Sequence, residues 1–123
     1  MGIGVSAHRL AGSVAAMGGV GTLSAVDLRR HHPDLMARTQ GLAARVGRDA
    51  ATKLAIDQAN VEAVQREITS ARALSAGRGL LAMNVMRAVS DYAAYVKAAL
   101  EAGIDAVVVG AGLPLDLPDL AQD

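Results

Sequence analysis

The sequence predicts an α/β fold built from parallel βα units. Short apolar runs alternate along the chain with longer segments of helical periodicity, and glycines stand at most of the boundaries between them. Alternation of this kind is typical of βα units around a parallel sheet. The last apolar run leads directly into a glycine-rich loop, and α/β sheets and barrels bind their ligands where strands end.

The first predicted element is a helix that Ser6 can cap. Its apolar residues Leu10, Val14 and Met17 recur at spacings of four and three residues, which predicts that they share one helix face. The glycine pair that follows ends this helix. The short apolar run Val20–Ser24 then predicts a buried strand.

The middle of the chain is predicted to be helical. The polar stretch Asp27–Pro33 predicts a loop or a broken helix start, and Asp34–Val46 predicts a second, short helix that ends at Gly47. The longest helix is predicted from Asp49 to about Ser75, because this stretch contains neither glycine nor proline. The apolar residues that recur in it at helical spacing are Leu54, Val61, Val64, Ile68, Ala71 and Leu74.

Two more strands and one helix complete the predicted pattern. The apolar run Leu80–Met86 contains Asn84, Ser90 caps the next helix, and Asp105–Val109 is a third strand. One further helical turn is expected after Pro118. No linker interrupts the pattern, so residues 1–123 are expected to form one incomplete unit. The residues expected to point inward from the helix after Ser90 are Tyr92, Tyr95, Val96, Ala99 and Leu100.

The composition argues against several classes of partner. Twelve basic and twelve acidic residues give a formal net charge of zero, and two tyrosines are the only aromatic residues. The chain therefore has neither the field nor the stacking platforms that attract nucleic acid, nor the charge that attracts an anionic membrane. Without cysteine, disulfides and thiolate metal sites are excluded. No stretch approaches the roughly 20 apolar residues of a membrane span, so a cytoplasmic location is the default expectation.

One candidate ligand site lies at the start of the chain. Gly2, Gly4 and Ala7 fit the spacing of a Rossmann-like glycine fingerprint, and Asp27 stands where its ribose-binding acid would be. The fingerprint must follow a strand, and almost nothing precedes Gly2 here. A turn of small residues that packs a helix start is therefore the preferred interpretation.

The second candidate is the loop that begins with Gly110, Ala111 and Gly112 at the end of the third strand. Its glycines would let backbone amides approach a ring or a phosphate closely, although an ordinary tight strand exit has the same composition. Asn84 is the third candidate, because a buried amide needs hydrogen-bond partners. Its side chain either bonds the neighbouring backbone or points into a ligand pocket.

The remaining polar residues favour structural roles. His31 and His32 are adjacent in the sequence and do not easily face one metal ion, so a solvated loop is the preferred interpretation. His8 is expected to be exposed or to pack in the first turn of its helix. Asp116 and Asp119 are expected to begin a helix rather than to form a catalytic pair.

Five stretches, taken in order, resemble the nitronate monooxygenase family, formerly called 2-nitropropane dioxygenases, to which flavin-dependent enoyl reductases are related. The first three resemble the exit of the family's opening strand, its second strand and its Gly-Val-Asn strand. The last two resemble the next strand and its exit loop. These stretches are Met1–Ser6, Gly18–Ser24, Leu81–Met86, Glu101–Ile104 and Gly110–Pro114. The resemblance implies that the parallel βα units form a partial TIM-type (β/α) barrel.

The resemblance also implies an FMN site at the C-terminal ends of the strands. The backbone around Met1 and Gly2 would contact the flavin ring, Asn84 would hydrogen-bond the cofactor, and the loop Gly110–Gly112 would line the pocket. The family reaction is the oxidation of alkyl nitronates by O2, in which FMN supplies the redox chemistry. A small nitronate or an enoyl-type molecule is the implied substrate.

The chain also departs from the family. The family's opening strand would precede Met1, and its catalytic histidine and FMN-phosphate site belong to later segments that have no counterpart here. A complete barrel needs roughly 200 residues or more. We therefore expect the chain alone to be inactive, and to self-associate or pair with a C-terminal half because its sheet exposes an edge and an apolar face. A nucleotide-binding α/β domain and a non-catalytic assembly module are the alternatives.

Overall fold

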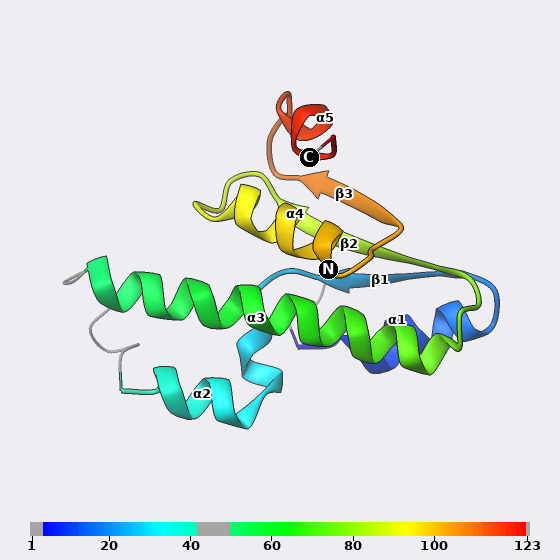
Figure 1. The fold of residues 1–123 in the computed structure, drawn as a ribbon, viewed down its shortest axis with the longest axis horizontal. Coiled ribbons are helices and arrows are strands. Elements are labelled where there is room, and N and C mark those ends of the chain that lie inside the picture. Colours follow the sequence, from blue (N-terminus) through cyan, green and yellow to red (C-terminus); the bar gives the residue numbers. More distant parts are fainter. Residues whose placement is uncertain (1–3, 42–49, 123) are drawn as a thin grey trace.

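The computed structural model describes residues 4–41 and 50–122. Strands and helices alternate in it (Figure 1), as the sequence predicts. The elements are α1 (His8–Ala16), β1 (Val20–Ser24), the 3₁₀ helix η1 (Leu28–His31), α2 (Pro33–Thr39), α3 (Ala50–Ser75), β2 (Leu80–Met86), α4 (Tyr92–Glu101), β3 (Ala106–Gly110) and α5 (Leu117–Leu120).

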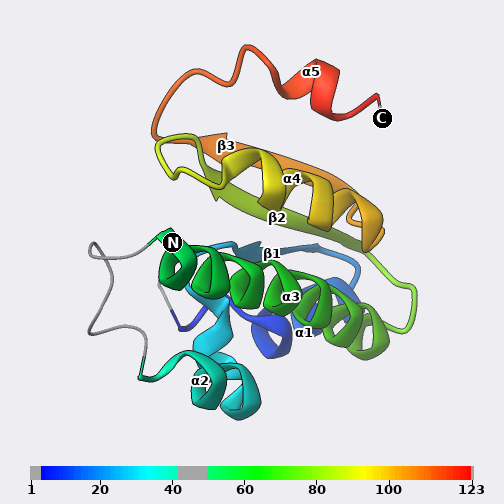
Figure 2. The same ribbon diagram turned by 60° about the vertical axis from the view of Figure 1, so that its left-hand side comes forward.

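The three strands form one parallel sheet in the order β1-β2-β3. The helices α3 and α4 connect consecutive strands, and Figure 2 shows them in front of the sheet on the same side. Ser24 of β1 pairs with Asn84 of β2, which in turn pairs with Val108 of β3. Because the strands are parallel, their C-terminal ends meet along a single edge of the sheet. The predicted α/β class is therefore confirmed.

The hydrophobic core lies between the sheet and the helices. Alternate residues of the strands face this core, and Leu23, Leu81, Met83 and Val85 have no exposed surface. The main helical contributions are Val64, Ile68, Tyr92, Tyr95, Val96 and Ala99, all of them predicted to point inward. Each large apolar side chain buried in this way stabilises the fold by about 1.5–3 kcal/mol.

Helix α1 packs through its small residues and not through Leu10, Val14 and Met17, whose spacing predicted a shared helix face. Those three side chains are exposed, Met17 by 91%. The buried face consists of Ala11, Gly12 and Ala15. Small residues form the buried face because they let the backbone of α1 approach β1 and α3 closely, which longer side chains would prevent. Ser6 does not cap α1 either, since the N-cap is Ala7 and has no side-chain hydrogen bond.

Helix α3 begins and ends close to the predicted positions, but part of its buried face differs. Leu54 and Leu74 are exposed by 58% and 48%. Polar and small residues are buried in their place, namely Thr52, Ala59, Asn60, Ala63, Glu67 and Ser75. The predicted second helix is shorter than expected: α2 ends at Thr39, and residues 42–49 lie outside the described part of the chain.

The third strand starts one residue later than predicted, because Asp105 has another role. Its Oδ2 atom accepts hydrogen bonds from the Leu81 backbone N–H at 2.7 Å and from Arg72 at 2.9 Å. These contacts, the backbone hydrogen bond first, hold the pKa of Asp105 below its ordinary value of 3.8. Asp105 thus fastens the start of β3 to β2. None of the helices in the described residues is both long and apolar enough to cross a bilayer.

Candidate cofactor-binding face

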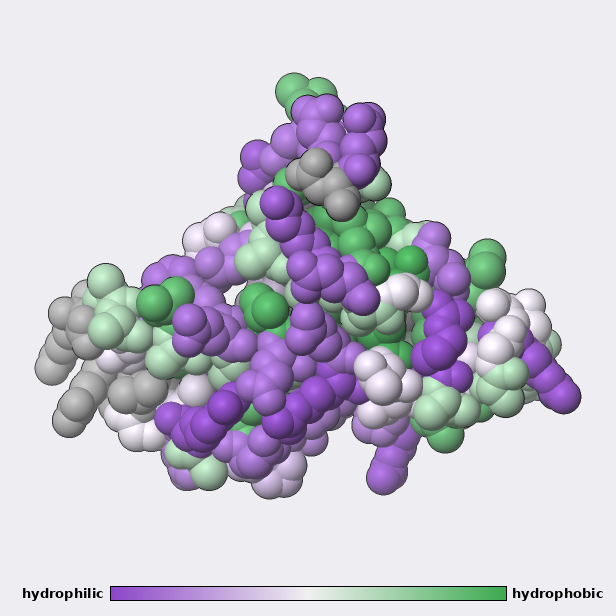
Figure 3. Space-filling model, in the orientation of Figure 1, coloured by the Kyte–Doolittle hydropathy of each residue, from purple (hydrophilic) through white to green (hydrophobic). Residues whose placement is uncertain are grey.

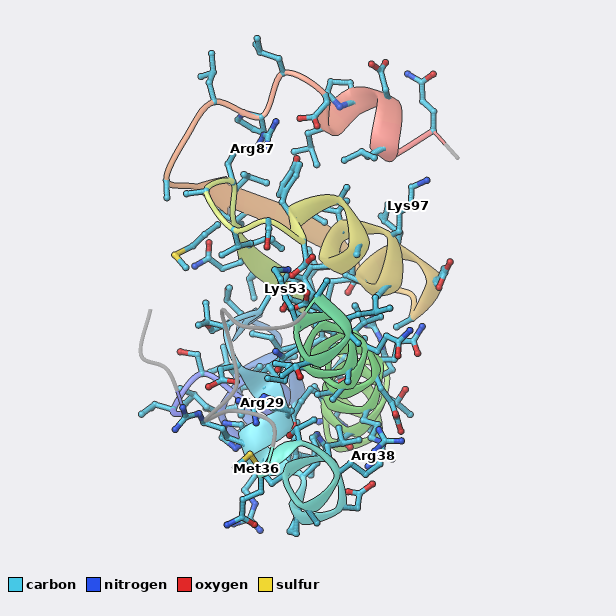
Figure 4. The ribbon with its side chains drawn as sticks, turned by 90° about the vertical axis from the view of Figure 1, so that its left-hand side faces the viewer. Arg29, Met36, Arg38, Lys53, Arg87 and Lys97 are labelled. Carbon is cyan, nitrogen blue, oxygen red and sulfur yellow. The ribbon has the colours of Figure 1, made fainter. Side chains whose placement is uncertain are left out.

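The side of the sheet opposite the core is an open face. In Figure 4 the strands lie between this face and the helices α3 and α4. Val20, Leu80 and Val108 on the open face are 51–56% exposed, whereas Leu23, Leu81 and Met83 on the core side have no exposed surface. Ser24 and Ala82 on the open face are buried. The open face is formed by Val20, Thr22 and Ser24 of β1, Leu80, Ala82, Asn84 and Met86 of β2, and Ala106, Val108 and Gly110 of β3.

Asn84 lies near the C-terminal end of the open face. Its register partners are Ser24 and Val108, and its backbone carbonyl accepts the N–H of Ala25 at 3.0 Å. The side chain is half-buried. Among the described residues, nothing hydrogen-bonds its side-chain amide. Of the two interpretations left open by the sequence, the bond to neighbouring backbone is not formed among the described residues, and Asn84 lies on the open face.

The loop after β3 begins beside Asn84. Gly110 shares the open face, pairs with Met86, and accepts the Arg87 N–H through its carbonyl at 2.8 Å. Ala111 and Gly112 have φ angles of 56° and 134°, so the chain leaves the sheet through a left-handed turn. A Cβ atom on Gly110 would meet no other atom within 4 Å. Open space therefore adjoins the strand end.

The structure brings together only part of the predicted cofactor site. Asn84 and Gly110 share one face of neighbouring strands, and the exposed backbone of Ala111 and Gly112 continues from it. The predicted flavin contacts at Met1 and Gly2 fall outside the described residues. The N-terminal segment nevertheless reaches the edge of β1 near Asn84, because the Ser24 N–H donates to the Ser6 carbonyl at 2.9 Å.

Four cavities of 250–370 Å³ lie among the helices or between α4, β3 and α5. The most apolar surface is seen in Figure 3 around α4 and β3, where Leu100, Ile104, Val107 and Leu117 line one of these cavities. The sheet would cover one side of a ligand that lies on the open face.

Sequence reasoning missed a buried acid on the helix side of the sheet. Glu67 of α3 has no exposed surface. Its Oε2 accepts the backbone N–H of His8 at 2.7 Å and lies 2.9 Å from His8 Nδ1, while Oε1 lies 3.0 Å from His32 Nε2 without hydrogen-bond geometry. The signal was present, because Glu67 lies three residues from Val64 and four from Ala71 on the predicted buried face.

Glu67 supplies the cap that α1 lacks. The first N–H groups of a helix have no partner within the helix and carry a partial positive charge. Ala7 has no side chain that can accept from them, so the Glu67 carboxylate does so from another helix. This explains why a charged residue is tolerated in the core. It also places His8, which was expected to be exposed or to pack, and His32, which was expected in a solvated loop, on the side of the sheet opposite Asn84.

Comparison with known proteins adds no constraint to this geometry. The chain matches no protein-family model and none of the curated proteins searched.

Proposed function

We propose that the chain forms the βα units of an FMN-dependent oxidoreductase barrel of the nitronate monooxygenase type. The observation that carries the proposal is Asn84. It presents an amide without a partner among the described residues on the open face, next to a strand end where Gly110 leaves room. In TIM-type barrels, ligands bind at this end of the strands.

The open face suits the ring of a flavin. Val108 and Met86 border Asn84 and offer apolar contacts to a planar ring, while the amide can donate to ring oxygens or accept from the ring N–H. Exposed backbone at Ala111 and Gly112 can approach the ring edge closely because no strand covers it. Met1 and Gly2 complete the proposed site by resemblance. When bound, FMN would supply the redox chemistry.

The described residues support binding and orientation rather than catalysis. A general base must lie within hydrogen-bond reach of the proton that it removes. His8 and His32 contact Glu67 on the helix side of the sheet, and His31 lies in η1. We therefore expect a nitronate or enoyl-type substrate to bind only in a complete barrel, and we expect the chain alone to show no turnover.

An incomplete barrel of this kind would self-associate or pair with a C-terminal half. Among the described residues, β1 and β3 each have one neighbour in the sheet, so each presents a free edge. Apolar surface lies near both edges. At the β1 edge, Leu10 and Val14 of α1 are exposed, and near β3 an apolar cavity lies between α4, β3 and α5. Further βα units would cover both.

The nucleotide-binding alternative is less well supported. In that function Asp27 would need a free carboxylate to bind a ribose. Its carboxylate is instead engaged by the Nε atoms of Arg29 and Arg30. A related flavin-dependent enoyl reductase would use the same open face. A non-catalytic assembly module would use only the free edges of the sheet.

Replacing Asn84 with valine tests the proposed site. Asn84→Val should weaken FMN binding about tenfold, because a buried hydrogen bond to a ligand contributes roughly 1–1.5 kcal/mol. Fluorescence titration of FMN measures the affinity, and urea unfolding should show that the variant is at least as stable as the wild type, since valine suits an apolar strand.

Thr22→Val is the matched control. Thr22 of β1 also lies on the open face, two residues before Ser24, which is the register partner of Asn84. It is therefore farther from the C-terminal ends of the strands. Its replacement should leave the affinity for FMN unchanged. Equal FMN affinity in wild type and Asn84→Val would remove the main support for the flavin proposal.

A further inference from the structure

A second polar cluster lies at the C-terminal edge of the sheet, outside the open face. Arg87 and Tyr92 stand at the two ends of the connection between β2 and α4, and Asp116 lies in the connection between β3 and α5. Figure 4 shows Arg87 extending from the end of the sheet toward the segment between β3 and α5. The cluster adjoins the glycine loop, since a Cβ atom on Gly112 would lie 3.1 Å from the Arg87 side chain.

A cation–π contact and an ion pair hold the cluster together, but neither is a hydrogen bond. The guanidinium carbon of Arg87 lies 4.8 Å from the centre of the Tyr92 ring, which is a cation–π distance. Arg87 Nε lies 3.5 Å from Asp116 Oδ1, within ion-pair range but outside hydrogen-bond geometry. Tyr92 is only 2% exposed, so its position is fixed by packing.

Three buried polar atoms in this cluster have no hydrogen-bond partner among the described residues. They are Arg87 Nε, the Tyr92 hydroxyl and Asp116 Oδ1. Burial, followed by the charge of Asp116, raises the pKa of Tyr92, so its hydroxyl remains protonated and able to donate at neutral pH. Two donors without hydrogen-bond partners among the described residues therefore lie in one cluster with the Asp116 carboxylate. Leaving such donors unpaired costs free energy, which an acceptor oxygen would recover.

We propose that Arg87 and Tyr92 bind the oxyanion of a phosphate monoester or of free phosphate. Arg87 would supply the charge-assisted hydrogen bond and Tyr92 a neutral one to the same group. Asp116 competes with this anion for Arg87. Its side chain is 45% exposed and lies in a segment with exposed leucines at 113 and 115, so it can turn toward solvent when the anion binds. The proposal does not depend on flavin binding.

Titration of the whole chain with inorganic phosphate, followed by calorimetry, tests this inference. The wild type should bind phosphate saturably. Arg87→Ala should lose about tenfold or more in affinity, and Tyr92→Phe a smaller factor, because a charged hydrogen bond contributes more than a neutral one. Asp116→Asn should bind phosphate several-fold more tightly, because the competing carboxylate is gone. Absence of binding to the wild type, or unchanged affinity in Arg87→Ala, would overturn the proposal.

The Asp116→Asn result separates a binding site from a structural ion pair. If the three residues served only the fold, this variant would lose stability and gain no affinity for phosphate, which would also overturn the proposal. Thermal unfolding of each variant monitors folding, and Arg87→Lys keeps the charge if Arg87→Ala fails to fold. Competition then identifies the source of the oxyanion: FMN that displaces phosphate while riboflavin does not indicates the cofactor's own phosphate, whereas failure of both indicates a free phosphate or another monoester.

Discussion

Replacing Glu67 with alanine is expected to lower the free energy of unfolding by about 3 kcal/mol or more. The change removes the acceptor for the first N–H of α1, leaves the rings of His8 and His32 without their partner, and opens a cavity in the core. Leaving a buried donor without its acceptor costs about 1–3 kcal/mol and the cavity adds to this loss, out of a total stability of about 5–15 kcal/mol for a typical domain. Urea unfolding followed by circular dichroism measures the loss.

Two further variants test the cause of that loss. Glu67→Gln keeps the size and one acceptor oxygen, so it should be less destabilising than Glu67→Ala. Glu62→Gln, five residues earlier on α3, removes a carboxylate whose side chain is 38% exposed and paired with Arg38 and Arg66. Ion pairs at the surface contribute little, so its unfolding midpoint should barely move. Equal losses in Glu62→Gln and Glu67→Ala would contradict the capping role of Glu67.

Replacing Gly21 with alanine is expected to have a comparable effect by a steric route. The added Cβ atom would lie 1.9 Å from the Ala11 carbonyl oxygen and 2.6 Å from its carbon. Both are backbone atoms, so α1 as a whole must move away from β1. Overpacking of this severity costs about 3 kcal/mol or more. The expected result is a large drop in the urea midpoint, or a chain that does not fold.

Gly110→Ala is the control for this steric argument. It makes the same change in another strand of the sheet, at a position where the new Cβ atom meets nothing within 4 Å. Its stability should equal or slightly exceed that of the wild type, because alanine has less backbone entropy to lose. If Gly21→Ala unfolds at the same urea concentration as Gly110→Ala, α1 does not pack on β1 as described.

Two of the strands could be predicted from sequence because their signals are local. Val20–Ser24 and Leu80–Met86 are strands with the predicted bounds, since each is an apolar run bounded by glycine or polar residues. The buried face of α1 could not be predicted in this way. Two faces of α1 compete, and the choice of Gly12 and Ala15 over Leu10 depends on how closely two backbones approach, which periodicity does not encode.

The candidate sites show the same division. Asn84 was recognisable because an amide interrupts an apolar strand, and its place beside Gly110 followed from parallel pairing. The contacts of Glu67 and the cluster of Arg87, Tyr92 and Asp116 were not predictable, because their members are separated in sequence by connections of unknown path. Residues that meet only through tertiary structure leave no spacing signal in one sequence.

The central claim is that a flavin ring rests on the open face of the sheet. Titrating isotopically labelled protein with FMN, and following the methyl resonances of the strands by NMR, tests it most directly. Successive strand residues point to opposite sides, so each strand contains its own control. We predict that Val108 and Met86 shift with FMN concentration, while Met83 and Val85, buried on the core side, stay in place. Shifts confined to the core or the helices, or none at all, would contradict the account.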